Sequence, residues 1–289
     1  MVPNRMDKID RYVDRVQRLA PAPKVVAQVL LLFADPNREV DRLAELISYD
    51  PSLTVEMLRR SNSAFFRGAE PASDVFEAVT RLGFNEAQSV ATALVGMPAA
   101  SLTGARDAGD ADRLWRHSVM TAVAAGALAA LVHDTEVKAF TAGLLHDVGK
   151  LVLAAFEGAA YADMMRQYGA SGSALARAEE ARLGVTHPEI GARLLARWGL
   201  PGNIISAILH QHHPPPAGAP FERLTATLQL ADSLAHHLTG GETPSPDPAS
   251  SNPEAMTLLE LTAEDVQTAG EQIQERLRQV QELLHIPAW

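Results

Sequence analysis

The chain has 289 residues and no cysteine, and its 35 acidic residues outnumber its 25 basic residues, which gives a formal net charge of −10. An acidic surface repels the phosphates of nucleic acids and anionic lipids, so we expect neither DNA nor a membrane as partner. Without cysteine there can be no disulfide and no thiolate metal site, so any metal must be held by nitrogen and oxygen. We find no signal peptide and no apolar stretch of membrane-spanning length, which predicts a cytoplasmic protein.

Residues 7–100 show the pattern of several short helices and predict an N-terminal helical bundle. Asp50 is an N-cap candidate, and the following Pro51 suits the first turn of a helix. Apolar residues recur at every third or fourth position from Val40 to Ile47, which gives a short helix one apolar face. Gly83 is placed to end a further helix.

The next segment, Thr103–Asp112, is polar and lacks apolar periodicity, so we expect a linker between two helical units there. Residues 113–238 then predict a second helical bundle. Its expected helices cover Leu114–Leu131, Thr135–Phe156, Ala174–Leu183, Pro188–Trp198, Gly202–Gln211 and Arg223–Leu238.

The C-terminal part begins with residues 239–256, whose richness in proline, serine and glycine predicts a flexible loop. Residues 257–286 predict a C-terminal helix with a capping box formed by Thr262 and Asp265. Its apolar stripe consists of Val266, Ala269, Ile273, Leu277, Val280 and Leu284. Two interpretations are open, since such a stripe can dock on its own bundle or form a homodimer or partner interface.

The first residues that could take part in chemistry are His146 and Asp147, which are adjacent in the sequence at the end of an apolar helical run. Adjacent side chains on a helix point about 100° apart, so both can face one pocket only at the edge of the buried stripe. Imidazole beside carboxylate suits a divalent cation such as Fe, Mn, Mg or Zn. His117 and Asp232 also lie on apolar helix faces, so these four residues need a common explanation. That explanation is either a bound metal or a fully hydrogen-bonded polar network.

The order of these residues resembles the HD superfamily of metal-dependent phosphohydrolases, in which a His, an adjacent His-Asp pair and a distant Asp bind metal. The resemblance implies His117, His146, Asp147 and Asp232 as metal ligands. In the related HD-GYP phosphodiesterases, further histidines complete a multinuclear site, and the matching candidates for additional metal or ligand contacts here are His187, His210, His212 and His213. The segment PPPAGAP that follows lacks the GYP residues, so we do not expect hydrolysis of cyclic dinucleotides.

From about Leu19 to about Leu238 the chain is similar to the HDOD (HD-related output domain) family. The resemblance rests on segments in family order: LAPAPKVVAQVLLLFADP, ISYDPSLTVEMLRRSNSAFFRG, FEAVTRLGF, WRHSV, AGLLHDVGKLVL and HPEIGARLLARWGLP. It implies an all-α, two-part fold and a bacterial signalling output module with a vestigial metal site. Such a module acts by binding a signalling protein in trans or a small ligand.

The alternative function is an active metal-dependent phosphohydrolase that acts on a nucleotide or phosphoester. Under that hypothesis Lys150 contacts a phosphate, and otherwise it is a helix-end cation favoured by the helix dipole. We expect the remaining histidines at the surface, and these are His133, His236, His237 and His285.

Overall fold

The computed structural model describes residues 4–16, 19, 21–34, 39–66, 68–95, 108–169, 172–213, 221–238 and 247–287, and all secondary structure in these ranges is α-helical. The all-α prediction is therefore confirmed. The N-terminal helices are α1 (Arg5–Val13), α2 (Pro23–Ala34), α3 (Val40–Ile47), α4 (Pro51–Ser61), α5 (Val75–Leu82) and α6 (Phe84–Val95).

The remaining helices follow in chain order. The central ones are α7 (Ala108–Leu131), α8 (Glu136–Leu145), α9 (Val148–Glu157), α10 (Ala159–Tyr168), α11 (Gly172–Leu183), α12 (His187–Arg197), α13 (Gly202–Leu209) and α14 (Glu222–Leu238). The last ones are α15 (Pro248–Ser251), α16 (Pro253–Leu259) and α17 (Ala263–Leu284).

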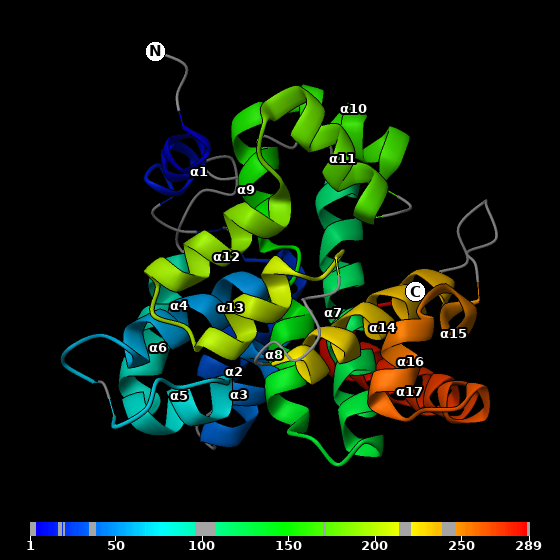
Figure 1. The fold of residues 1–289 in the computed structure, drawn as a ribbon. Helices are drawn as coiled ribbons and strands as arrows, with labels where there is room; N and C mark the ends of the chain where they lie inside the picture. Colours follow the sequence, from blue (N-terminus) through cyan, green and yellow to red (C-terminus); the bar gives the residue numbers. More distant parts are fainter. Residues whose placement is uncertain are drawn as a thin grey trace.

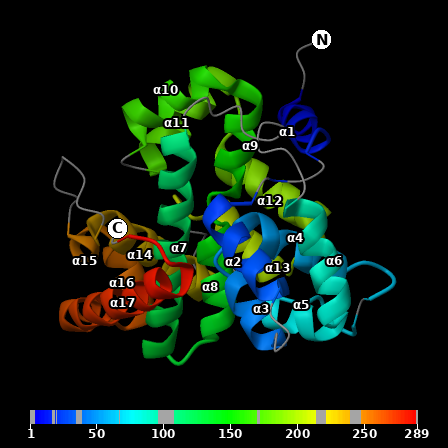
Figure 2. The ribbon, with the colours of Figure 1, turned by 180° about the vertical axis from the view of Figure 1, so that it is seen from behind.

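Helices α7 and α8 lie at the centre of the molecule. Helices α2 to α6 gather on one side of this pair and α14 to α17 on the other, as Figures 1 and 2 show from opposite directions. The central pair packs backbone to backbone, since a Cβ on Gly143 would lie 2.7 Å from the carbonyl oxygen of Thr121. Alanine-rich α7 permits this close approach of the two backbones.

Local signals set several helix ends. The Asp50 side chain accepts a hydrogen bond from the Leu53 amide at 2.7 Å and caps α4, as predicted. Gly83 ends α5 with φ +76°, which glycine adopts without strain. Thr186 and Glu189 form a capping box at the start of α12, where Pro188 occupies the first turn.

Three expected boundaries are corrected by the structure. Helix α7 begins at Ala108, inside the predicted linker, and Asp112 in its first turns is paired with Arg116 at 2.7 Å and with Lys24 at 2.5 Å. The expected helix over Thr135–Phe156 is two helices, because the chain turns at positions 146 and 147.

The third correction concerns the loop predicted at 239–256. Residues 239–246 lie outside the described residues, but 248–251 and 253–259 are helical. Each of these short helices has a proline in its first turn, and Asp247 caps the first of them by accepting a bond from the Ser250 amide at 3.0 Å. The Asp-Pro signal that starts α4 therefore operates here too.

Helix α17 carries the C-terminal stripe, and its capping box of Thr262 and Asp265 is present. All six stripe residues are buried within this chain, where α17 packs along α7 and touches α2. The stripe is thus docked on its own bundle, and a homodimer through this helix would have to use its opposite face.

Two helical stretches, Ala111–Leu131 and Glu136–Glu157, are long and apolar enough to cross a membrane if judged by length and composition alone. In the most apolar window of each, 72% of the residues are buried inside the bundle. Core helices of a helix bundle have the same properties, and these two form its centre (Figure 1).

Candidate metal centre

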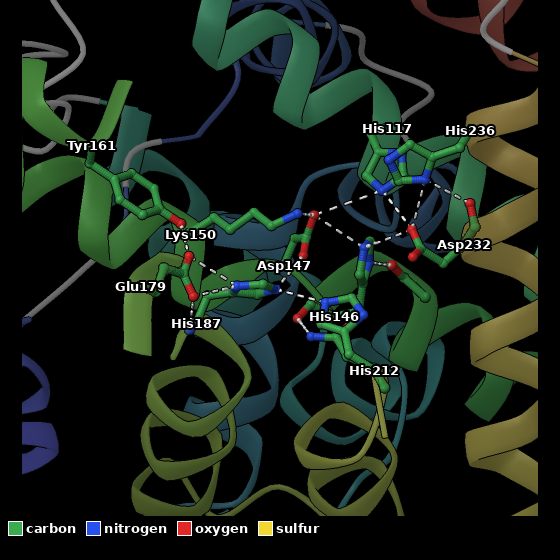
Figure 3. Close-up of polar contacts among 12 residues, drawn as sticks. His117, His146, Asp147, Lys150, Tyr161, Glu179, His187, His212, Asp232 and His236 are labelled. Carbon is green, nitrogen blue, oxygen red and sulfur yellow. Dashed lines mark hydrogen bonds and ion pairs between the residues drawn. The ribbon is translucent and has the colours of Figure 1, made fainter. Parts of the chain in front are cut away.

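Three separate parts of the chain bring the four predicted metal ligands together (Figure 3). His117 comes from α7, His146 and Asp147 from the turn between α8 and α9, and Asp232 from α14. His117 Nε2 lies 2.9 Å from Asp232 Oδ1 and 3.7 Å from Asp147 Oδ2. His146 Nε2 lies 3.2 Å from Asp147 Oδ2 and 3.7 Å from Asp232 Oδ1. Four side chains distant in sequence therefore converge on one point.

The turn between α8 and α9 explains how two adjacent residues face the same point. His146 keeps helical angles, whereas Asp147 has φ −100° and ψ 12° and starts the next helix. The changed ψ ends α8 and swings the carboxylate toward the imidazole, which a continuous helix would not allow. Gln211 lies just after the end of α13. Its Nε2 donates to the carbonyl oxygen of His146 at 3.0 Å and stabilises the turn.

Hydrogen bonding prepares His146 for a ligand role. Its Nδ1 lies 2.7 Å from the carbonyl oxygen of Gly143, an arrangement in which Nδ1–H donates and Nε2 is the nitrogen that faces the cluster. That nitrogen lies toward the carboxylates of Asp147 and Asp232 (Figure 3). Burial works to lower the pKa of His146, but the charge of Asp147 outweighs it and raises this pKa, which favours a proton on Nε2 that a bound metal would replace.

Four buried polar atoms of the cluster make no hydrogen bond within the part of the chain that the structure describes. They are His117 Nε2, His146 Nε2, Asp147 Oδ1 and Asp232 Oδ1. They approach one another or a neighbouring histidine at 2.9–3.7 Å without the geometry of a hydrogen bond. Because buried polar atoms are normally satisfied, these four are the atoms that a bound metal would satisfy. Imidazole nitrogens and carboxylate oxygens are a donor set that fits a divalent metal.

His236 belongs to this centre, so its predicted surface position is wrong. It follows Asp232 by one helical turn on α14, and its Nδ1 lies 2.9 Å from the backbone oxygen and 3.2 Å from Oδ1 of Asp232. Its ring packs on His117 at 4.3 Å between centroids. The i,i+4 spacing from Asp232 was the signal that could have identified it. The other three histidines with this prediction, His133, His237 and His285, are exposed.

A second polar cluster adjoins the first through Asp147. His187 Nδ1 lies 2.8 Å from Glu179 Oε2, and His187 Nε2 lies 3.0 Å from His212 Nε2. The unbonded Asp147 Oδ1 lies 3.6 Å from His187 Nε2. The Tyr161 hydroxyl donates to Glu179 Oε1 at 2.6 Å. Asp147 therefore presents one oxygen to each cluster.

Sequence reasoning missed Glu179 and Tyr161. Both are fully buried, yet neither stands at a helical spacing from His187, because a turn separates α11 from α12. Among the described residues, His210 and His213 lie outside both clusters. His210 Nδ1 is 2.9 Å from the backbone oxygen of Ser206, and His213 is exposed.

Lys150 is a buried member of the site. Its Nζ lies 2.7 Å from Asp147 Oδ2, and its side chain is 6% exposed. It stands in the first turn of α9, where the helix dipole disfavours a cation, so the helix-end interpretation is wrong. Charge pairing with Asp147 keeps this lysine in place.

The two carboxylates of the first cluster stay ionised. Burial works to raise the pKa of Asp147, but the charges of His146 and Lys150 outweigh it and hold this pKa well below the usual range. Burial also works to raise the pKa of Asp232, but the neighbouring His236 and His117 outweigh it. The pKa of Asp232 therefore also lies well below the usual range. Both acids are in the form that binds metal.

Two histidines are neutral near pH 7. Burial lowers the pKa of His117 to about 4, and burial with the neighbouring His187 lowers the pKa of His212 to about 3. In contrast, the Asp232 charge outweighs burial and raises the pKa of His236 to about 9. His117 and His212 are thus free to act as ligands, while protonated His236 is a donor toward Asp232.

An all-helical bundle in which a His from one helix, a His-Asp pair from a turn between helices and an Asp from a further helix meet defines an HD-type protein. More specifically, the chain belongs to the HDOD family, whose HDOD domain model matches residues 19–214. Asp232 and His236 lie beyond the matched segment.

The chain is also similar to individual proteins of known sequence or structure. The structure is similar to the MmoQ response regulator of Methylococcus capsulatus, with a TM-score of 0.73 and 27% identity over 88% of this chain and 98% of that chain. A protein of Treponema pallidum with no assigned function is 28% identical over 80% of this chain and 44% of its own length. Ribonuclease Y of Thermus thermophilus is 30% identical over 53% of this chain and 22% of its own length. The chain therefore spans less than half the length of these two relatives.

Proposed function

We propose that this protein is a cytoplasmic output module of bacterial signal transduction that binds a divalent cation in its His-Asp pocket. It acts by binding a signalling protein in trans or a small ligand, and catalytic turnover is not its task. Membership of the HDOD family and the likeness to a response regulator support the signalling role. The absence of the GYP residues after His213 supports the lack of turnover.

The proposal of a bound metal rests on the buried polar atoms that make no hydrogen bond. Three of them, on His117, His146 and Asp232, face the shared point at which Asp147 Oδ2 also arrives. A cation there would compensate the two buried carboxylates and satisfy both imidazoles. Two nitrogen and two oxygen ligands favour Mn, Fe or Zn, while Mg prefers oxygen and retains its water.

The partial exposure of some proposed ligands indicates the route by which a metal could enter the site. Asp147 and His146 are each 1% exposed at the side chain, whereas His117, Asp232 and His236 are 14%, 16% and 21% exposed. Solvent therefore reaches the cluster from the side of α7 and α14. A position open to that side would accept water or a ligand atom.

The test is elemental analysis of anaerobically purified protein, combined with thermal unfolding under added Mn²⁺, Fe²⁺, Zn²⁺ or Mg²⁺. We expect bound metal near one equivalent and a higher melting temperature, because a ligand that binds only the folded state stabilises it. Asp147→Asn should abolish both, while exposed His213→Ala should leave both unchanged. Metal-free protein that shows no thermal response would refute the metal site.

An active phosphohydrolase is the second candidate, and Lys150 favours it. The ammonium group stands directly beside Asp147 Oδ2, where it could contact a phosphate as a point charge. A hydrolytic relative, Ribonuclease Y, covers half of this chain. The metal would activate water for attack on phosphorus.

Turnover of p-nitrophenyl phosphate and bis(p-nitrophenyl) phosphate by metal-loaded protein separates the two functions. The signalling proposal expects no turnover above that of Asp147→Asn protein. Turnover that Asp147→Asn and Lys150→Met abolish would replace the signalling proposal with the phosphohydrolase.

A further inference from the structure

A cavity of about 630 Å³ lies beside α8, where α3 and α5 of the N-terminal part meet the central helices. Helix α17 contributes Arg276 to its wall. None of the metal-centre residues lines it. Its volume lies in the range of small-molecule sites, which is about 300–1,000 Å³.

The wall of this cavity is aromatic and partly uncovered. Tyr49 and Phe140 meet edge to face with centroids 5.9 Å apart. Phe76 and Val137 also line the cavity, and each is 43% exposed, although both are large apolar side chains. A bound apolar group would remove this surface from water.

The charges around the cavity are unbalanced toward negative. Its lining includes five carboxylates, from Glu39, Asp41, Glu45, Asp74 and Glu136, and two guanidinium groups. Arg42 is paired with Glu45 at 2.8 Å, and Arg276 lies 3.9 Å from Glu136. Within the described ranges, Glu39 and Asp41 have no ion pair. Among the residues that the structure describes, two arginines therefore leave three of the five carboxylates without a cationic partner.

We propose that this cavity is a binding site for a small organic cation with an aromatic body. The aromatic and apolar wall would hold the body, and the faces of Tyr49 and Phe140 also attract a cation. The unpaired carboxylates of Glu39 and Asp41 would face the charge. An anion would be repelled by the same lining.

The position of the cavity connects it to the helices that carry the His-Asp pocket. Leu144 in its wall is two residues before His146 on the same chain segment. The Tyr49 carbonyl accepts a hydrogen bond of 2.8 Å from Trp115 Nε1, and Trp115 is two residues before His117. The site is independent of the proposed metal, yet it lies where a small-molecule signal would contact both parts of the protein.

Three indole probes with the same body and different charge test the proposal on the full chain. Tryptamine is a cation, tryptophol is neutral and indole-3-acetate is an anion. In calorimetric titration we expect saturable one-to-one binding of tryptamine, weaker binding of tryptophol and none of indole-3-acetate. Equal binding of all three, or no saturable binding of tryptamine, would overturn the proposal.

Variants locate the binding. Replacing Glu39 and Asp41 by Gln and Asn should weaken tryptamine binding about threefold to fivefold, as expected for two exposed charges. Val137→Trp fills the cavity from an exposed position and should abolish binding without disturbing the fold. Glu254→Gln with Glu264→Gln removes two exposed charges elsewhere and should change nothing. Binding that survives Val137→Trp would place the probe elsewhere and contradict the proposal.

Discussion

A single buried carboxylate, Asp50, joins two helices of the N-terminal part. Its Oδ2 accepts from the Ala22 amide at 2.5 Å just before α2, and its Oδ1 caps α4. Burial raises its pKa to about 6, although the backbone hydrogen bonds from Ala22 and Leu53 oppose this. The residue thus stabilises a junction while it resists ionisation.

Asp50→Ala should destabilise the protein by about 1–3 kcal/mol, because two buried amides lose their acceptor. The wild-type carboxyl binds its proton more tightly in the folded state, since its folded pKa of about 6 exceeds the ordinary aspartate pKa of 3.8. Its protonation therefore adds stability below pH 4 that is lost as the pH rises through 6. Urea unfolding at pH 4, 5, 6 and 7 gives the unfolding free energies of wild type and Asp50→Ala, and the difference between them at each pH measures this contribution. A difference that does not vary with pH would contradict the raised pKa.

His236 is expected to position Asp232 rather than bind metal, because its Nδ1 already faces two oxygens of that residue. Under the proposed metal site, His236→Ala should weaken metal affinity about tenfold to a hundredfold, as removal of such outer partners does. His236→Gln should retain most of the affinity, because an amide can also donate to Asp232. The matched control is His237→Ala, because His237 follows His236 in the sequence and is exposed. Equal losses in both His236 variants would make this imidazole a ligand instead.

The contact of helix α9 with helix α12 depends on Gly149. A Cβ at this position would lie 1.9 Å from the carbonyl oxygen of His187, a backbone atom that cannot move away alone. Gly149→Ala should therefore destabilise the fold by more than about 3 kcal/mol. On α17, a Cβ at Gly270 would meet nothing within 4 Å, so Gly270→Ala should be neutral or stabilise by up to about 1 kcal/mol. Thermal and urea unfolding of the two variants compares them directly.

The elements also show what sequence can predict here. Caps such as Asp50 and the box at Thr262 are local, so the helices they start were predictable. The break at His146 was not, because the residues around it carry an uninterrupted helical pattern. The turn is held by Gln211, 65 positions away, and such a distant contact leaves no local signal. The motif order predicted the four His and Asp residues that converge, while His236 and Glu179 required the packing of α14 and α11.

The C-terminal helix α17 completes the hydrophobic core, because its apolar stripe packs on α7 and α2. The stripe on α17 includes five Val, Ile and Leu residues, each at most 6% exposed. Burial of each contributes about 1.5–3 kcal/mol, so their sum is on the order of the net stability of a domain, about 5–15 kcal/mol. Deletion from Thr262 onward would also uncover the faces of α7 and α2 that receive the stripe. We therefore expect the truncated chain to lose cooperative unfolding.

A milder change tests the same role without removing the helix. Ile273 is fully buried at the centre of the stripe, and Ile273→Ala should cost about 2–5 kcal/mol in urea unfolding. Glu271→Ala on the exposed face of α17 should stay within about 0.5 kcal/mol of wild type. If the stripe served a homodimer instead, Ile273→Ala would lower the mass measured by sedimentation and make the loss of stability depend on protein concentration. Because all six stripe residues are buried within one chain, we expect an unchanged mass and a concentration-independent loss.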